Sequence, residues 1–241
     1  MIYIQIEEGK HCFDFGALAE IGCRQLKYEY KYFEDVSEIK HDPNNVIVGS
    51  VEQSIKYMET HGITSPPAID LLHFKQYLGR SIKLISTKEL LSTYKDVNYP
   101  IFAKPYDKIK AFDGTVLMND FDAHIVLQKI DCILAVQPIM NILSEYRVYI
   151  HHKKILAVKS YLGDPLIFPD KSVIKQVVEF ANNTLTHRSY CLDFAVISEN
   201  GWTKTILLEP NDAWAIGNYG LEPSLYVNFL KDRWLQITNI F

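Results

Sequence analysis

Charged side chains interrupt the apolar strands predicted in the C-terminal half of this 241-residue sequence. Asp193 stands in C-L-D-F-A-V-I, and Glu209 follows I-L-L and precedes Pro210. A buried carboxylate is costly unless it is paired or bound to a metal, so the fold must supply partners. Residues two apart share a strand face, which puts Glu209 and Asn211 on one side. Two carboxylates and an amide oxygen suit Mg²⁺, and the alternative is that the acids pair with Arg or Lys.

A lysine ends another apolar strand. Lys104 closes P-I-F-A-K, where its point charge suits a phosphate group. Residues 108–114 follow as K-I-K-A-F-D-G, which predicts a loop with two cations that could fold over a nucleotide. The loop lacks the GxxxxGK[ST] pattern, so it is not a P-loop.

Two more cations lie inside a predicted hairpin. Arg147 and Lys159 stand in otherwise apolar strands and need anionic partners, for which phosphate or carboxylate is suitable. A two-residue turn at 152–153 directs Lys159 to the face opposite Arg147, whereas a three-residue loop or a bulge brings both onto one face. The neighbouring His151 and His152 lie beside two lysines and are expected to be solvated turn residues.

Alternation and residue type predict the secondary structure. Strands are expected near residues 1–6, 46–51, 100–104, 115–118, 133–138, 146–151, 154–161, 191–198 and 204–211, and helices at 51–61, 70–78, 87–94, 172–185 and 223–232. Ser50 is the expected N-cap of the first helix. The segment 62–67, G-I-T-S-P-P, is the first plausible boundary. The pattern predicts an α/β front piece followed by a mostly antiparallel α+β body.

Composition excludes several classes of protein. The 25 basic and 29 acidic residues give a net charge of −4, which argues against a general nucleic-acid binder. No apolar stretch approaches the length of a membrane helix, and the alternating, acidic N-terminus does not resemble a signal peptide. The four cysteines lack the spacing of a disulfide framework or a zinc site. These features favour a cytoplasmic globular protein.

In this order, the segments resemble the ATP-grasp fold, and in particular small bacterial and phage ATP-grasp proteins of the amidoligase type. The string at 209–221, E-P-N-D-A-W-A-I-G-N-Y-G-L, is the most specific part of the resemblance. Shorter elements that are similar to family motifs are V-I-V-G-S-V-E at 46–52, Y-L-G-R at 77–80, F-A-K-P at 102–105 with K-A-F-D-G at 110–114, E-Y-R at 145–147 and L-D at 192–193. The sequence departs from the family at Gln137, where many relatives carry Glu, and at Pro210, where Val is commoner.

The resemblance implies an α+β ATP-grasp fold, with two α+β lobes enclosing ATP. Residues 1–80 are then an N-terminal pre-ATP-grasp α/β region and residues 81–241 the ATP-grasp domain. The implied roles are nucleotide binding by Lys104, Lys110, Gln137 and Glu145, catalysis by Arg147 and Lys159, and Mg²⁺ binding by Asp193, Glu209 and Asn211.

The activity implied by the resemblance is that of an ATP-dependent carboxylate-amine ligase. Such an enzyme forms an amide through an acyl phosphate and releases ADP and phosphate, without a protein nucleophile. The expected partners are small-molecule or peptide carboxylates and amines, and neither nucleic acid nor a membrane. One alternative is a non-catalytic ATP-binding or interaction module. The other is an RNA-ligase-type nucleotidyl transferase, although K-A-F-D-G at 110–114 is one residue longer than the KxDG nucleophile pattern.

Overall fold

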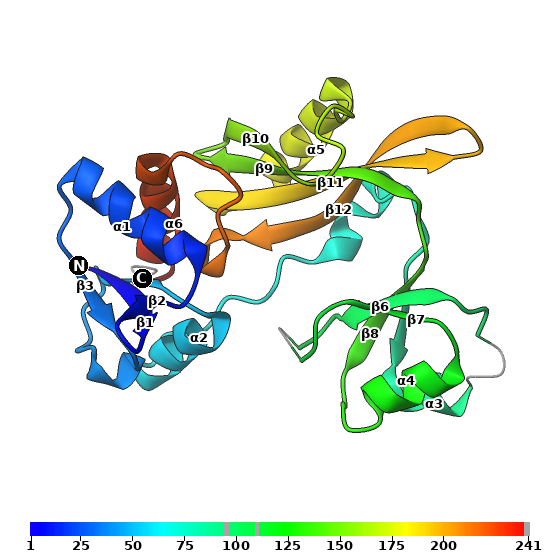
Figure 1. Cartoon of the computed structure of the whole chain (residues 1–241), viewed down its shortest axis with the longest axis horizontal. Coiled ribbons are helices and arrows are strands. Elements are labelled where there is room, and N and C mark those ends of the chain that lie inside the picture. The colour runs from blue at the N-terminus through cyan, green and yellow to red at the C-terminus, as the bar shows by residue number, and fades with distance from the viewer. Residues whose placement is uncertain (94–96, 109–110, 239–241) are drawn as a thin grey trace.

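Three four-stranded sheets organise the chain, and the computed structural model describes them within residues 1–93, 97–108 and 111–238. A long central sheet is flanked by an N-terminal group of strands and helices and by a smaller lobe (Figure 1). The order agrees with the α/β front piece and antiparallel body expected from the sequence. Among the described residues, no helix has the length and hydropathy needed to cross a membrane.

The N-terminal sheet has a parallel centre. β1 (Ile2–Glu7) pairs in parallel with β3 (Tyr30–Phe33) and with β4 (Val46–Val48), and β2 (Lys10–His11) pairs antiparallel with the end of β1. The helical elements of this part are α1 (Asp14–Leu26), the 3₁₀ turn η1 (Val36–Glu38) and α2 (Val51–Thr60). As expected, Ser50 caps α2, because its Oγ accepts a hydrogen bond from the Gln53 amide at 3.1 Å.

The C-terminal helix α6 (Pro223–Thr238) packs with these N-terminal elements. It lies beside α1 in Figure 1, and its Trp234 shares a hydrophobic core with Ile4 and Tyr57. Tyr149 of the central sheet belongs to the same core. The boundary expected at residue 80 stays a prediction, and this core contains residues from both sides of it.

A link and a small lobe follow. The 3₁₀ helix η2 (Leu71–Tyr77) forms where a helix is predicted, and it leads into a sheet of order β5-β8-β6-β7. The lobe contains β5 (Lys83–Ser86), α3 (Thr87–Ser92), β6 (Ile101–Pro105), β7 (Thr115–Leu117), α4 (Asp120–Leu127) and β8 (Ile133–Pro138). Its own core includes Leu90, Leu127 and Leu134. The lobe therefore presents β6 and β8 as an independent platform.

The central sheet is fully antiparallel, in the order β10-β9-β11-β12. Its strands are β9 (Ile142–His151), β10 (Lys154–Gly163), β11 (Ser189–Glu199) and β12 (Trp202–Asp212). The helix α5 (Lys171–Thr184) covers one face, where Val148, Leu192 and Phe194 pack against Val177. Alternation along the strands then directs Arg147 and Asp193 to the other face, toward the small lobe.

A buried ion pair fastens α6 to the end of β12. The Arg233 Nε and Nη2 atoms donate to the two Asp212 carboxylate oxygens at 2.7 and 2.6 Å. His187 Nε2 lies 3.2 Å from the same carboxylate. Burial acts to raise the pKa of Asp212, but the hydrogen bonds and charges of Arg233 and His187 lower it below its usual value. The carboxylate is therefore ionised, and its charge depends on Arg233.

We expect Arg233→Met to lower the free energy of unfolding by about 3–5 kcal/mol, because it leaves a buried carboxylate without its main partner. Urea denaturation at neutral pH measures this. The control is Lys56→Met, which removes the partner of Asp35 in a pair that is 48% and 42% exposed, and it should cost at most about 1 kcal/mol. Equal losses in the two variants would contradict the anchoring role of Arg233.

Candidate functional site

Three neighbouring strands bring a row of charges together on one face of the central sheet. Arg147 of β9 is the direct register partner of Asp193 of β11, and Asp193 is the direct partner of Glu209 of β12. Directly opposed residues point to the same face of a sheet. The register therefore assembles three of the predicted site residues.

Arg147 and Asp193 form a bidentate ion pair. Arg147 Nε and Nη2 donate to the two Asp193 oxygens at 2.8 and 2.7 Å, and the side chains are only 7% and 3% exposed. Arg147 Nη1 donates to the Gly217 carbonyl at 3.2 Å, and the guanidinium lies 4.3 Å from the centre of the Tyr219 ring. In this structure, Asp193 thus has the arginine partner that the alternative reading of the sequence describes.

Asn211 connects this pair to the small lobe. Its Nδ2 atom donates to Asp193 Oδ2 at 3.1 Å and to Glu209 Oε1 at 3.2 Å. The other oxygen of Glu209 accepts a hydrogen bond from Lys104 Nζ of β6 at 2.6 Å. One polar network therefore runs from β9 through β11 and β12 to β6.

Burial and charge act differently on the two acids. Burial raises the pKa of Asp193, Arg147 opposes this shift, and the nearby Glu209 and Glu145 carboxylates add to it. For Glu209, burial also acts to raise the pKa, but the Lys104 charge and the hydrogen bonds from Lys104 and Asn211 outweigh it and lower the pKa. Glu209 is the carboxylate held most firmly in its ionised form.

Lys159 lies on the same face as Arg147. The hairpin turns through His152 and Lys153, and the pairing shifts between Ile155 and Ala157, so that Lys159 becomes the direct partner of Arg147. Both features weighed from the sequence, a two-residue turn and a bulge, occur together. A second shift after Ser160 precedes the pairing of Leu162 with Glu145.

Glu145 and two tyrosines complete this end of the face. Glu145 lies two residues before Arg147 on β9 and borders a cavity together with Tyr161. The Tyr161 and Tyr219 rings stack with their centres 4.6 Å apart. Burial and the Asp193 and Glu145 carboxylates raise the pKa of Tyr161, so its hydroxyl keeps its proton at neutral pH.

That cavity has a volume of about 310 Å³ and lies between the small lobe and β12. Phe102, Ile139 and Leu208 are among its apolar walls, while Gln137 and Lys104 are among its polar groups. An apolar slot with few polar groups is the usual form of a small-molecule site. Its size and polarity fit a planar heterocycle with an anionic tail directed at Lys104.

Arg80 belongs to this cavity and was not predicted as a site residue. Its Nε donates to Gln137 Oε1 at 2.8 Å, and its Nη1 and Nη2 donate to the Leu207 and Leu208 carbonyls at 2.7 Å. Burial lowers the pKa of Arg80 to about 10, which still leaves it charged at neutral pH. The sequence signal was available in Y-L-G-R, where a charged residue follows an apolar helix.

Gly79 allows this placement of Arg80. It has a φ of +61°, and a Cβ at this position would lie 2.3 Å from Cγ2 of Ile206. A larger residue is excluded on both grounds. The glycine lets the chain pass close to β12 and turn the arginine back onto its carbonyls.

A second cavity, of about 510 Å³, lies on the other side of Lys104 and Glu209. Asn211 and Asp70 border it, together with Phe112, Asp113 and Gly114 of the predicted loop. Lys110, the other predicted phosphate-binding lysine, lies outside the described residues. Lys104 and Glu209 border both cavities, so their ion pair forms a common wall.

The predicted residues differ in their access to these cavities. Lys104, Gln137, Glu145, Glu209 and Asn211 line one or both of them. Within the described residues, the linings include neither Arg147 nor Asp193 nor Lys159. These three form the layer behind Glu209 and Asn211.

Comparisons with known proteins were made for both sequence and structure. Residues 77–229 match an ATP-grasp domain family that is described as family 2 of its clade. No functionally curated protein shows significant sequence similarity to the chain.

Solved ATP-grasp structures are similar over nearly the whole chain. A RimK domain ATP-grasp protein from Sphaerobacter thermophilus has a TM-score of 0.59 at 10% identity, covering 95% of this chain and 99% of that one. D-alanine–D-alanine ligase from Bacillus anthracis, complexed with ATP, has a TM-score of 0.57 at 11% identity, covering 98% and 96%. The ATP-grasp ligase PsnB, complexed with minimal precursor, has a TM-score of 0.52 at 12% identity, covering 96% and 98%. The α+β ATP-grasp fold expected from the resemblance is confirmed.

The two acids should differ in metal-free stability. We expect Asp193→Asn to lower the free energy of unfolding by about 3–5 kcal/mol, because it leaves the Arg147 guanidinium buried and uncompensated. Glu209→Gln should cost about 1 kcal/mol or less, because both members of the Lys104–Glu209 pair reach solvent. Urea denaturation in buffer with a chelator tests this. A stabilised Asp193→Asn protein would mean that repulsion among the carboxylates outweighs the ion pair.

Proposed function

The chain belongs to this family of ATP-grasp domains, and we propose on this basis that it is an ATP-dependent carboxylate-amine ligase. It would form an amide through an acyl phosphate and release ADP and phosphate. The observation that carries the proposal is the Lys104–Glu209 ion pair, which borders two cavities at once. A reaction between a nucleotide and a second substrate needs two such compartments with a charged boundary.

The nucleotide is proposed to occupy the smaller cavity. The apolar walls suit the adenine ring, and Gln137 supplies a side-chain amide whose orientation Arg80 fixes. Lys104 stands where the phosphates would leave this cavity, and Glu145 lies on its far side near Tyr161. An ammonium on a strand is a suitable phosphate ligand. Lys110 is proposed as a second phosphate-binding lysine from the loop.

The chemistry of the donor set fits a magnesium ion. Glu209, Asn211 and Asp193 form one hydrogen-bonded cluster of oxygen-bearing side chains, and Mg²⁺ takes oxygen ligands in preference to nitrogen. These three residues are the proposed ligands. When bound, the ion would neutralise charge on the phosphate oxygens.

The reaction is proposed to need positioning and charge rather than a protein nucleophile. A substrate carboxylate oxygen attacks the γ-phosphorus, and the bond to the ADP oxygen breaks. The nitrogen of an amine then attacks the acyl carbon, phosphate leaves, and the amine loses a proton. Arg147 and Lys159, which share a face with Glu209, are the proposed cations that offset charge on the transferred phosphoryl group.

The substrates are proposed to be small or peptide carboxylates and amines. Two structural relatives span this range by name, one being a D-alanine–D-alanine ligase and the other a ligase complexed with a minimal precursor. The larger cavity would take the carboxylate substrate, since it adjoins Glu209 and Asn211.

We expect hydroxylamine to capture the acyl group when ATP, Mg²⁺ and a panel of amino acids and peptides are supplied. Hydroxylamine replaces the unknown amine, so only the carboxylate has to be found, and the hydroxamate is measured against ADP release. Glu209→Gln should abolish both products, whereas Glu179→Gln on the exposed side of α5 is a matched control that should retain them. ATP binding without either product across the panel would favour a non-catalytic module. Covalent AMP from α-labelled ATP, lost in Lys110→Ala, would favour the nucleotidyl transferase.

Nucleotide affinity should depend on Lys104. We expect Lys104→Met to weaken ATP binding by about 1.5–3 kcal/mol, because a charge-assisted hydrogen bond to phosphate is lost while most of the side-chain stem remains. Calorimetry with a non-hydrolysable ATP analogue measures the change. Lys88→Met serves as the control, since Lys88 is 78% exposed and pairs with Asp131 in the same lobe. An unchanged affinity in Lys104→Met would remove the phosphate assignment.

A further inference from the structure

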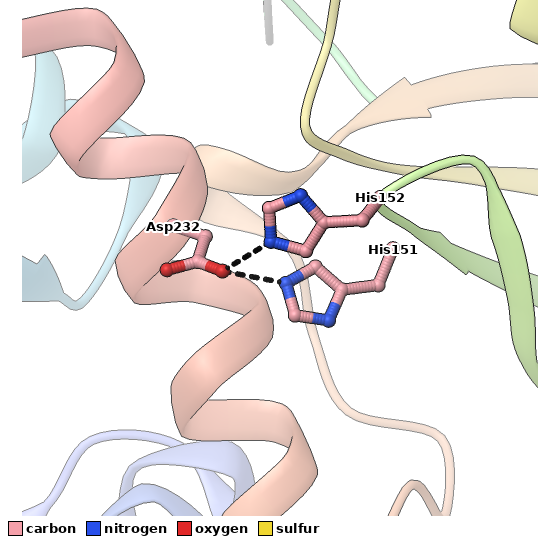
Figure 2. Close-up of side chains that lie close together, drawn as sticks. All are labelled: His151, His152 and Asp232. Atoms are coloured by element: carbon pink, nitrogen blue, oxygen red, sulfur yellow. Dashed lines mark hydrogen bonds and ion pairs between the residues drawn. The ribbon is translucent and has the colours of Figure 1, made fainter.

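Two adjacent histidines at the β9–β10 turn converge on an aspartate of α6. His151 Nε2 lies 2.8 Å and His152 Nε2 lies 2.7 Å from the same oxygen of Asp232, as Figure 2 shows. The side chains are 17%, 57% and 30% exposed, respectively. The sequence-based expectation of solvated turn residues is therefore wrong, since His151 is largely covered and both imidazoles have a carboxylate partner.

The turn holds the two imidazoles in place. His152 and Lys153 have φ values of +47° and +63°, in the left-handed region that non-glycine residues rarely adopt. Neighbouring groups secure this backbone, because the His152 amide donates to the Arg188 carbonyl at 2.7 Å and Asn182 Nδ2 donates to the Lys153 carbonyl at 2.8 Å. An unfavourable conformation that its surroundings enforce is a recurrent feature of functional sites.

The donor set is that of a transition-metal site. One ligand atom from each of the three side chains lies within 4.8 Å of the other two. Ligands of a tetrahedral zinc ion lie about 3.3 Å apart, which follows from metal–ligand distances near 2.0–2.1 Å, so small side-chain rotations suffice. Imidazole nitrogen with carboxylate oxygen suits zinc and its first-row neighbours.

We propose that His151, His152 and Asp232 bind a divalent transition-metal ion of the zinc type, with solvent completing its coordination. This site differs in chemistry from the oxygen-rich cluster of Glu209 and Asn211. The ion would replace the two Nε2–H protons that now face Asp232, so its binding releases protons and weakens in acid. It would also tie the hairpin to α6, joining residues 81 positions apart in the sequence.

The test is calorimetric titration of the full chain with Zn²⁺, with Mg²⁺ in excess to occupy oxygen-rich sites. We expect one equivalent to bind to the wild-type protein, and His152→Ala and Asp232→Asn each to weaken it by about tenfold or more. His124→Ala, which removes an exposed histidine of α4, is the matched control and should leave the affinity unchanged. Since His152 is more than half exposed, its replacement leaves the core intact and decides the matter even if Asp232→Asn is unstable.

Co²⁺ supplies a second readout. The wild-type protein with one equivalent should show the visible absorption of low-symmetry, four- or five-coordinate cobalt, and His152→Ala should lose it. The proposal is overturned if the wild-type protein fails to bind one equivalent of Zn²⁺. It is equally overturned if both variants bind Zn²⁺ as tightly as the wild type does.

Discussion

The buried ion pair between Arg147 and Asp193 is the interaction on which the rest of the site depends. It crosses from β9 to β11 at a point where the register opposes the two residues directly. From it, hydrogen bonds lead to the Gly217 carbonyl on one side and through Asn211 and Glu209 to the small lobe on the other. Because a buried charge is costly without its partner, the pair fixes the spacing of three strands and the loop that covers them.

In the proposed function, ligand binding is an exchange of partners rather than the filling of an empty charged pocket. Without ligands, the acids and bases of the site satisfy one another, as Lys104 does with Glu209. A polyphosphate would take over the lysine, and a metal would take over the carboxylate. The site can thus contain many charges without a large cost to the free energy of folding, since each charge has a partner in both states.

The sequence predicted the strands that carry the site, because their apolar runs and charged interruptions are local features. It did not predict α1, whose Gly16 and Gly22 lower helix propensity and whose existence depends on packing against α6. It did not assign a role to Arg80, because the partners of this residue are backbone carbonyls far away in the sequence. The pairing of His151 and His152 with Asp232 was also missed, since it depends on where α6 returns.

The bulge after Ile155 gives the hairpin a parity. One extra residue on β10 makes Lys159, rather than Val158, the partner of Arg147. Removing that residue would leave every side chain chemically unchanged, yet it would turn the lysine away from Arg147 and expose an apolar neighbour in its place. Among natural variants of this hairpin, length changes between the turn and Lys159 should therefore come in pairs of residues, whereas substitutions there are free to vary. Insertions and deletions, more than point changes, mark the segment where chemistry constrains evolution.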